Sequence, residues 1–238
     1  MRASANRDIL RGREFLDDRA LAPELAIRSL RDIARSNRLF GGTRAVLAEL
    51  RDDLRADGTP HARPLTVFDA GTGAGDIPFA IREAGRRNGC DVRTVGLEWT
   101  APLARAAAPL AQVTMAGDAR ALPIARGAFD IAVCAQVLHH FSYADALTIV
   151  CELDRIARRR VVIGEIRRTV AAAAGIWLAS WPLGFHPVSR HDGVVSVFRG
   201  FTVTELAALV HDAIGVAPVV RRHAGFRVTA SWVPRGKP

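Results

Sequence analysis

The chain has 238 residues, and nearly half of them (49%) are hydrophobic, which suits one α/β domain with additional elements and a sizeable core. Its net charge of +9 comes almost entirely from arginines spread along the sequence. We therefore expect a solvated basic surface rather than a nucleic-acid-binding patch. No run of about 18 uncharged apolar residues occurs, which excludes an ordinary membrane-spanning helix.

The cysteines and the N-terminus bear on the cellular environment. Cys90, Cys134 and Cys151 have no metal-like spacing, and their odd number argues against a disulfide framework. The first residues are charged and lack the apolar segment of a secretory signal. We expect no metal site from this pattern and a cytoplasmic location.

Helical periodicity dominates the first part of the chain. Apolar residues recur at helical spacing over residues 8–57, and the Gly41–Gly42 pair divides this run into two helices. Residues 58–64 form a linker rich in Pro and Gly. We therefore expect residues 1–60 to form an N-terminal helical cap.

Strands and helices then alternate, which predicts a parallel sheet with helices on both faces. The expected strands are 65–69, 92–97, 112–115, 129–135 and 160–166, and the expected helices are 76–87, 100–110 and 142–158.

The alternation of strands and helices ends after residue 167. Residues 170–185 are apolar but interrupted by Gly and Pro, so we interpret about 168–201 as an inserted helical lid over the open end of the sheet. A helix over 204–212 follows. Two strands, 217–222 and 226–233, are joined by a turn short enough for an antiparallel hairpin.

A glycine-rich loop follows the first strand. Gly71, Gly73 and Gly75 allow close approach of a ligand to the backbone before the next helix begins. The spacing is not that of a dinucleotide fingerprint, because Asp76 stands where the third glycine would be. Asp69, at the end of the strand, suits an ammonium group better than a pyrophosphate.

Further acidic residues follow the next two strands. Glu98 closes the second strand, where a carboxylate can accept hydrogen bonds from two ribose hydroxyls. Asp118 follows the third strand, where it can accept from an adenine amino group. Each acid alone has a structural alternative, as a helix cap, a solvated strand end or a turn residue, but three in this order favour a nucleoside site.

With these motifs in order, residues 65–166 resemble the core of class I S-adenosylmethionine-dependent methyltransferases. The resemblance implies a Rossmann-like seven-stranded sheet with an antiparallel last strand, a methyltransferase domain over 61–238, and S-adenosylmethionine as the cofactor. The cofactor-binding residues implied are Asp69, Gly71, Thr72, Gly73, Gly75, Asp76, Glu98, Trp99, Asp118, Ala119 and Gln136.

The flanking segments carry a narrower resemblance. Leu30–Gly42, Val161–Arg168, Arg190–Phe201 and Arg221–Arg227 are together similar to bacterial methyltransferases associated with type III polyketide synthases. This implies a phenolic or pyrone acceptor from secondary metabolism. The acidic turn usual after the fifth strand is here Gly164-Glu165 rather than Asn-Asp.

The lid supplies the candidate acceptor pocket, for a small hydrophobic molecule methylated on oxygen, or alternatively on carbon. Its aromatic residues equally suit plain packing of the lid onto the core, and a peripheral membrane contact is a further alternative. The candidate substrate-binding residues are Trp177, Trp181, Phe185, His191, Phe198 and Arg199.

Histidines after the fourth strand are candidates for the base, because imidazole titrates near neutral pH. We favour His139, with His140 and the His191-Asp192 pair as alternatives; His139 could instead only order its loop.

Other function classes have weaker support in the sequence. An NAD-dependent oxidoreductase is disfavoured by the glycine spacing and by the lack of a Tyr-x-x-x-Lys pair. Amino-directed base methylation generally uses a Pro-Pro-aromatic run after the fourth strand, where this chain has Cys134-Ala-Gln-Val. Methylation of RNA or another macromolecule, C-methylation of a quinol, and a non-catalytic cofactor-binding protein stay open, as does the oligomeric state.

Overall fold

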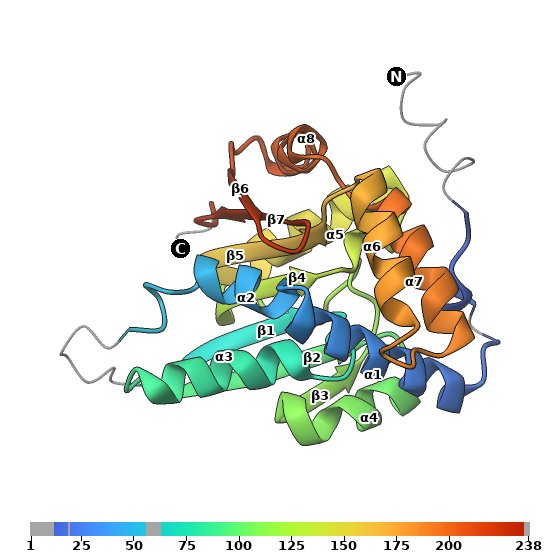
Figure 1. Cartoon of the computed structure of the whole chain (residues 1–238). Helices are drawn as coiled ribbons and strands as arrows, with labels where there is room; N and C mark the ends of the chain where they lie inside the picture. Colours follow the sequence, from blue (N-terminus) through green and yellow to red (C-terminus); the bar gives the residue numbers. More distant parts are fainter. Residues whose placement is uncertain (1–11, 19, 56–62, 236–238) are drawn as a thin grey trace.

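The computed structural model describes residues 12–18, 20–55 and 63–235. Its centre is a seven-stranded sheet in the order β3-β2-β1-β4-β5-β7-β6 (Figure 1). The strands are β1 (Leu65–Ala70), β2 (Val92–Glu98), β3 (Val113–Ala116), β4 (Phe129–Ala135), β5 (Ala157–Ile166), β6 (Val219–His223) and β7 (Arg227–Trp232). The first five strands pair in parallel, and β7 runs antiparallel between β5 and β6. The predicted Rossmann-like fold class is confirmed.

Helices cover both faces of the sheet, because the central strands are apolar on both sides. One face packs against α2 (Gly42–Glu49) and α3 (Asp76–Arg87), and the other against α5 (Tyr143–Ile156) and α8 (Val203–Ile214). Val67 and Phe68, adjacent on β1, point into the two different cores and are both fully buried. Helix α4 (Ala101–Ala111) packs beside β2 and β3.

The N-terminal region contains a short 3₁₀ helix, η1 (Phe15–Asp17), and the helix α1 (Pro23–Leu39), which precedes α2. The break between α1 and α2 falls at Gly41, whose φ of 81° is left-handed, as the Gly-Gly pair predicts. Residues 58–62 of the predicted linker lie outside the described residues.

The predicted helical lid contains two helices, α6 (Val170–Ser180) and α7 (Pro187–Arg199). Gly184, with a left-handed φ of 65°, and Pro187 separate them. Thr169 caps α6, and the side chain of His186 caps α7. The two helices pack against each other, and α7 also packs against α1 (Figure 1).

The C-terminal hairpin is held against the end of α1. Its turn contains Gly225, and a Cβ atom there would lie 1.9 Å from the carbonyl oxygen of Phe40. Only glycine therefore allows this approach. Within the described ranges, none of the helices is long and apolar enough to cross a membrane.

Candidate active site

The loop after β1 has the open backbone that the sequence predicts. Gly71, Gly73 and Gly75 have φ angles of 70°, 60° and 80°. Gly75 is the N-cap residue of α3, and a Cβ atom there would lie 2.9 Å from the backbone of Ala107 and Ala111 in α4. Glycine is required at this position because α3 and α4 approach each other so closely.

Asp69 ends this strand with a carboxylate that is only partly satisfied. It is fully buried, and its Oδ2 accepts a hydrogen bond from Thr72 Oγ1 at 2.8 Å. Its Oδ1 is buried and has no hydrogen-bond partner among the described residues. Burial, together with the charges of Asp76 and Glu98, raises the pKa of Asp69 to about 8. A buried acceptor in an acidic environment fits the ammonium group of S-adenosylmethionine.

Glu98 connects the end of β2 to the glycine-rich loop. Its Oε1 accepts a hydrogen bond from the backbone of Gly73 at 2.6 Å, and its Oε2 accepts one from the backbone of Trp99 at 3.2 Å. Burial raises the pKa of Glu98. The carboxylate thus lies beside the loop, where a ribose hydroxyl can compete for it.

Asp118 is less accessible to an adenine than the sequence suggests. Arg120 forms an ion pair with Asp118 at 2.7 Å and another with Asp145 at 3.0 Å. Its guanidinium also lies 5.9 Å from the ring of Trp99. Ala119, next in the chain, is buried. Arg120 was not among our candidates, and it lies where the adenine end of a nucleoside is expected.

Gln136 connects the site to α1 and to the C-terminal hairpin. Its backbone is left-handed, with a φ of 57°. Its Nε2 donates to Asn37 Oδ1, and its Oε1 accepts a hydrogen bond from Arg227 Nη1 at 2.8 Å. Asn37 also donates to Asp76 at 3.3 Å. The two predicted residues Gln136 and Asp76 are thus joined through Asn37.

His139 lies in the short 3₁₀ helix η2 (Leu138–His140), directly after β4, and is buried. Its Nδ1 lies 2.7 Å from Oε2 of Glu165, and the other Glu165 oxygen accepts hydrogen bonds from the backbone of Val137 and Leu138. Burial alone would raise the pKa of Glu165, but the charge and hydrogen bond of His139 outweigh it and lower that pKa. Glu165 is therefore an ionised group that fixes the imidazole ring.

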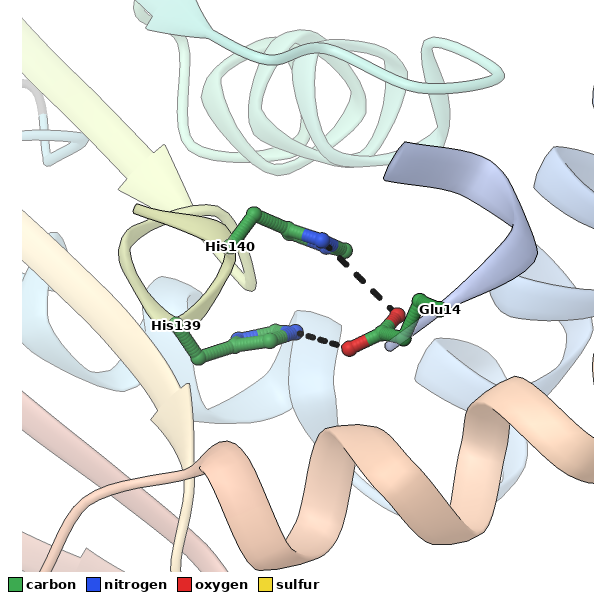
Figure 2. A group of neighbouring side chains, drawn as sticks. All are labelled: Glu14, His139 and His140. Carbon is green, nitrogen blue, oxygen red and sulfur yellow. Dashed lines mark ion pairs between the residues drawn. The ribbon is translucent and has the colours of Figure 1, made fainter. Parts of the chain in front are cut away.

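Glu14, from the segment before η1, reaches both His139 and His140 (Figure 2). Its carboxylate oxygens lie 3.8 Å from His139 Nε2 and 3.8 Å from His140 Nδ1. Burial raises the pKa of Glu14. Arg199 donates to Glu14 at 3.4 Å and also pairs with Asp17. The spacing of Glu14, His139 and His140 would suit a metal ion, but Arg199 already places a cation beside these carboxylates.

A cavity of about 240 Å³ lies next to this cluster, between α1, α6, α7, η2 and the hairpin turn. Most of its wall is apolar, and His139, His140, Gln136 and Arg227 contribute polar groups. The main apolar side chains in the wall are Ile33, Phe40, Ile166, Ile176, Phe185 and Phe226. Enclosed apolar walls with a few polar groups are typical of small-molecule sites.

The predicted acceptor aromatics are divided between this cavity and the surface. Phe185 is buried in the wall. Trp177, Trp181 and Phe198 are 50%, 56% and 41% exposed and lie outside the lining. Helix α6 is apolar on all sides, so its sequence has no periodicity that identifies the inward face.

The two polar lid candidates also lie outside the lining. His191 is exposed; its Nδ1 lies 2.9 Å from Asp192, and its ring is 4.8 Å from that of Phe15. Arg199 donates to the carbonyl oxygens of His139 and His140. Arg199 thus supports the histidine-bearing turn from behind.

Three polar residues of this region were not among the sequence candidates: Glu14, Glu165 and Arg227. The Gly164-Glu165 pair, which was expected as a turn but lies within β5, is the only signal in the sequence that points to one of them. Glu14 is more than 120 positions away from the two histidines in the sequence, so no local sequence pattern predicts their contact.

Residues 68–163 match a sequence family described as a methyltransferase domain. The match includes the glycine-rich loop, Glu98, Asp118 and His139, whereas Glu14, Glu165 and Arg227 lie outside it. The protein is therefore an S-adenosylmethionine-dependent methyltransferase, and S-adenosylmethionine is its cofactor. Among curated protein sequences there is no significant match to the chain.

Solved structures share the fold at low sequence identity. An S-adenosylmethionine-dependent methyltransferase from Aquifex aeolicus has a TM-score of 0.58 and 15% identity, over 88% of this chain and 97% of that one. Magnesium protoporphyrin IX methyltransferase from Synechocystis, with bound S-adenosylhomocysteine, has a TM-score of 0.54 and 18% identity, over 84% of this chain and 85% of that one. The same enzyme with bound S-adenosylmethionine has a TM-score of 0.52 and 15% identity, over 98% and 91% of the two chains.

Proposed function

We propose that this enzyme transfers a methyl group to an oxygen of a small, mostly apolar acceptor, of the phenolic or pyrone polyketide type found in bacterial secondary metabolism. The observation that carries the proposal is the apolar cavity with His139 in its wall and buried Glu165 behind the imidazole. A small acceptor also agrees with the name of the Synechocystis enzyme, which acts on a porphyrin.

The cofactor-binding part of the proposal uses the residues at the carboxyl ends of the first three strands. Asp69 Oδ1 would accept from the ammonium group, and Glu98 would accept from the ribose hydroxyls in place of its present contact with Gly73. Asp118 and Ala119 would border the adenine. S-adenosylmethionine supplies the methyl group as a sulfonium electrophile, and the protein's part is to align the acceptor oxygen and remove its proton.

The histidine turn provides the base. Ionised Glu165 accepts the Nδ1 proton of His139, which leaves Nε2 to take a proton from the acceptor hydroxyl. The imidazolium so formed would have Glu165 on one side and Glu14, 3.8 Å from Nε2, on the other. These carboxylates stabilise its charge.

The lid excludes water from the acceptor. We propose the division suggested by the sequence, with residues 1–60 as a helical cap, 61–238 as the catalytic domain and 168–201 as the lid. Asp32 of α1 accepts hydrogen bonds from the backbone of His186 at 3.0 Å and from Ser189 Oγ at 2.8 Å. These contacts hold α7 against α1 over the cavity.

The test is transfer of a labelled methyl group from S-adenosylmethionine to a panel of phenols, hydroxypyrones, quinols and RNA. We expect label on the oxygen of a phenol or hydroxypyrone. Label on RNA alone, label on a ring carbon alone, or no transfer to any acceptor would each contradict the proposal.

A further inference from the structure

Arg227 is a buried cation in the wall of the acceptor cavity. It begins β7, beside the hairpin turn, and is 5% exposed. Its Nε donates to the carbonyl oxygen of Phe40 at 3.3 Å, and its Nη1 donates to Gln136 Oε1 at 2.8 Å. Both of these acceptors are neutral.

Among the described residues, Arg227 has no ionic partner of its own. Within the described part of the chain, no carboxylate lies within 4.0 Å of its guanidinium, and Glu165 acts on it only at longer range. Burial lowers the pKa of Arg227 to about 10, so the side chain is still a cation at neutral pH. A buried charge without a counterion is unfavourable, and an anion brought by a ligand would relieve this.

The carboxylates in the cavity wall already have other partners. Glu14 accepts from Ser196 and Arg199. Asp32 accepts from the α7 groups described above, and Asp192 accepts from the backbone of Phe15 and Leu16. Within the described residues of the wall, Arg227 is the only arginine, and none of these carboxylates is paired with it.

We propose that Arg227 binds an oxyanion of the acceptor, so that the preferred acceptor is an apolar ring system that carries an ionised acidic group in addition to the hydroxyl to be methylated. This inference rests on the proposed function. Aromatic carboxylates and acidic enols of hydroxypyrones share this chemistry, and a guanidinium can donate to either.

The carboxylate of the cofactor is the competing anion, and the cavity argues against it. Of the predicted cofactor-binding residues, Gln136 lies in the wall that contains Arg227, whereas Asp69, Gly73, Glu98 and Asp118 do not. Phe185 and Ile176, which are in that wall, belong to the lid helices or the loop between them. Arg227 thus faces the space between lid and sheet, where the acceptor would lie.

The test is calorimetric binding to protein saturated with S-adenosylhomocysteine. The probes are 6-hydroxy-2-naphthoate and its uncharged amide, and 4-hydroxy-6-(4-hydroxyphenyl)-2-pyrone, whose phenol is the group to be methylated, with its 4-methoxy derivative. We expect the acidic member of at least one pair to bind roughly 10-fold or more tightly than its neutral partner, since charge-assisted hydrogen bonds are the stronger ones. Which pair shows the preference distinguishes a carboxylate from an enolate.

Arg227→Gln should abolish this preference, Arg227→Lys should keep part of it, and the exposed Arg222→Gln on the neighbouring strand should keep all of it. Equal binding of acid and neutral probes to the natural protein would overturn the proposal. So would a preference that survives in Arg227→Gln, or a loss of S-adenosylhomocysteine affinity as large as the loss of acid affinity. Because these are binding measurements, a failure of methyl transfer with an intact acid preference would reject the proposed function and leave the Arg227 site standing.

Discussion

The contact between His139 and Glu165 determines how the imidazole can act. Replacing His139 by Gln removes the base but leaves a polar side chain on the turn. We expect kcat to fall roughly 10²–10⁴-fold, while the affinity for S-adenosylhomocysteine changes little. A pH–rate profile and a calorimetric titration measure the two effects, and a variant with near-normal kcat and an unchanged profile would remove His139 from the mechanism.

Glu165 acts through His139 as a positioning residue. Replacing Glu165 should therefore change the pH–rate profile in a different way from replacing His139. In Glu165→Gln the amide no longer stabilises a protonated imidazole, so the neutral-pH limb of the kcat profile should move to lower pH. A purely structural role would lower stability without moving that limb. His191→Ala is the matched control, since this exposed histidine lies outside the cavity wall and should leave the profile unchanged.

Asp69 should couple cofactor binding to proton release. Its pKa of about 8 means that the unliganded protein holds this proton at pH 6.5. An ammonium group at Oδ1 would favour the ionised form, so binding of S-adenosylhomocysteine at pH 6.5 should release about one proton, and binding to Asp69→Asn should release none from this group. Calorimetry in buffers of different ionisation enthalpy gives the number, and equal release by both proteins would contradict the assignment.

The same raised pKa has a consequence for stability. A carboxyl whose folded pKa lies above its ordinary value contributes stability below that ordinary value, and the contribution is lost as pH rises through about 8. The unliganded protein should therefore lose stability as the pH rises from the ordinary carboxyl pKa to about 8, and the Asp69→Asn variant should lose less over the same pH range.

Residue roles could be predicted from sequence only where a short motif contains them. Asp69 and Glu98 end their own strands, so the order of strands was enough to place them. Glu165 lies near His139 because β5 pairs with β4, and Arg227 lies beside the cavity because β7 pairs antiparallel with β5, which brings Ile166 opposite Arg227. No local pattern encodes that pairing.

At the scale of elements, Asp130 joins the beginnings of β1 and β4. It accepts hydrogen bonds from Arg63 at 2.7 Å, Arg158 at 2.8 Å and the backbone of Thr66 at 2.9 Å. Burial alone would raise its pKa, but these contacts hold the pKa of Asp130 well below its usual value. The stabilisation is thus present above the ordinary carboxyl pKa and is lost as pH falls below it.

Asp130→Ala should lower the free energy of unfolding by roughly 1–3 kcal/mol at pH 7, because it removes a buried carboxylate that accepts charge-assisted hydrogen bonds. The difference between variant and natural protein should shrink as the pH is lowered below about 4. Arg63→Gln is the control: its side chain is half exposed, so its loss should change stability by less than about 1 kcal/mol. Urea unfolding of the natural protein and of both variants at several pH values measures these free energies. A difference between Asp130→Ala and the natural protein that does not change with pH would contradict the ion-pair account.

Strands and helices of the core were predictable because their apolar periodicity is strong. Helix α3 begins and ends where the sequence suggests, at Asp76 and Arg87. The lid was less predictable because α6 is apolar on every side, so neither the number of lid helices nor the direction of Trp177 and Trp181 follows from periodicity.

At the scale of the whole molecule, the lid is attached to α1 by the buried carboxylate of Asp32. Asp32→Ala removes the acceptor for His186 and Ser189, so α7 should sit less firmly over the cavity. We expect the KM for the acceptor to rise roughly 5–50-fold, because buried hydrogen bonds are lost. The Kd for the cofactor should stay unchanged. Arg31→Ala, an exposed position on the same helix, is the control. A parallel loss of cofactor affinity would show that Asp32 supports the fold rather than the lid.

The central claim is that cofactor and acceptor occupy separate, adjoining sites at the carboxyl end of the sheet. A crystal structure of the complex with S-adenosylhomocysteine tests it most directly. We predict the amino-acid end at Asp69, the ribose at Glu98 and the sulfur atom directed toward the cavity beside His139. A ligand that fills the cavity below α6 and α7, with its adenosine among Phe185 and Arg227, would contradict this account.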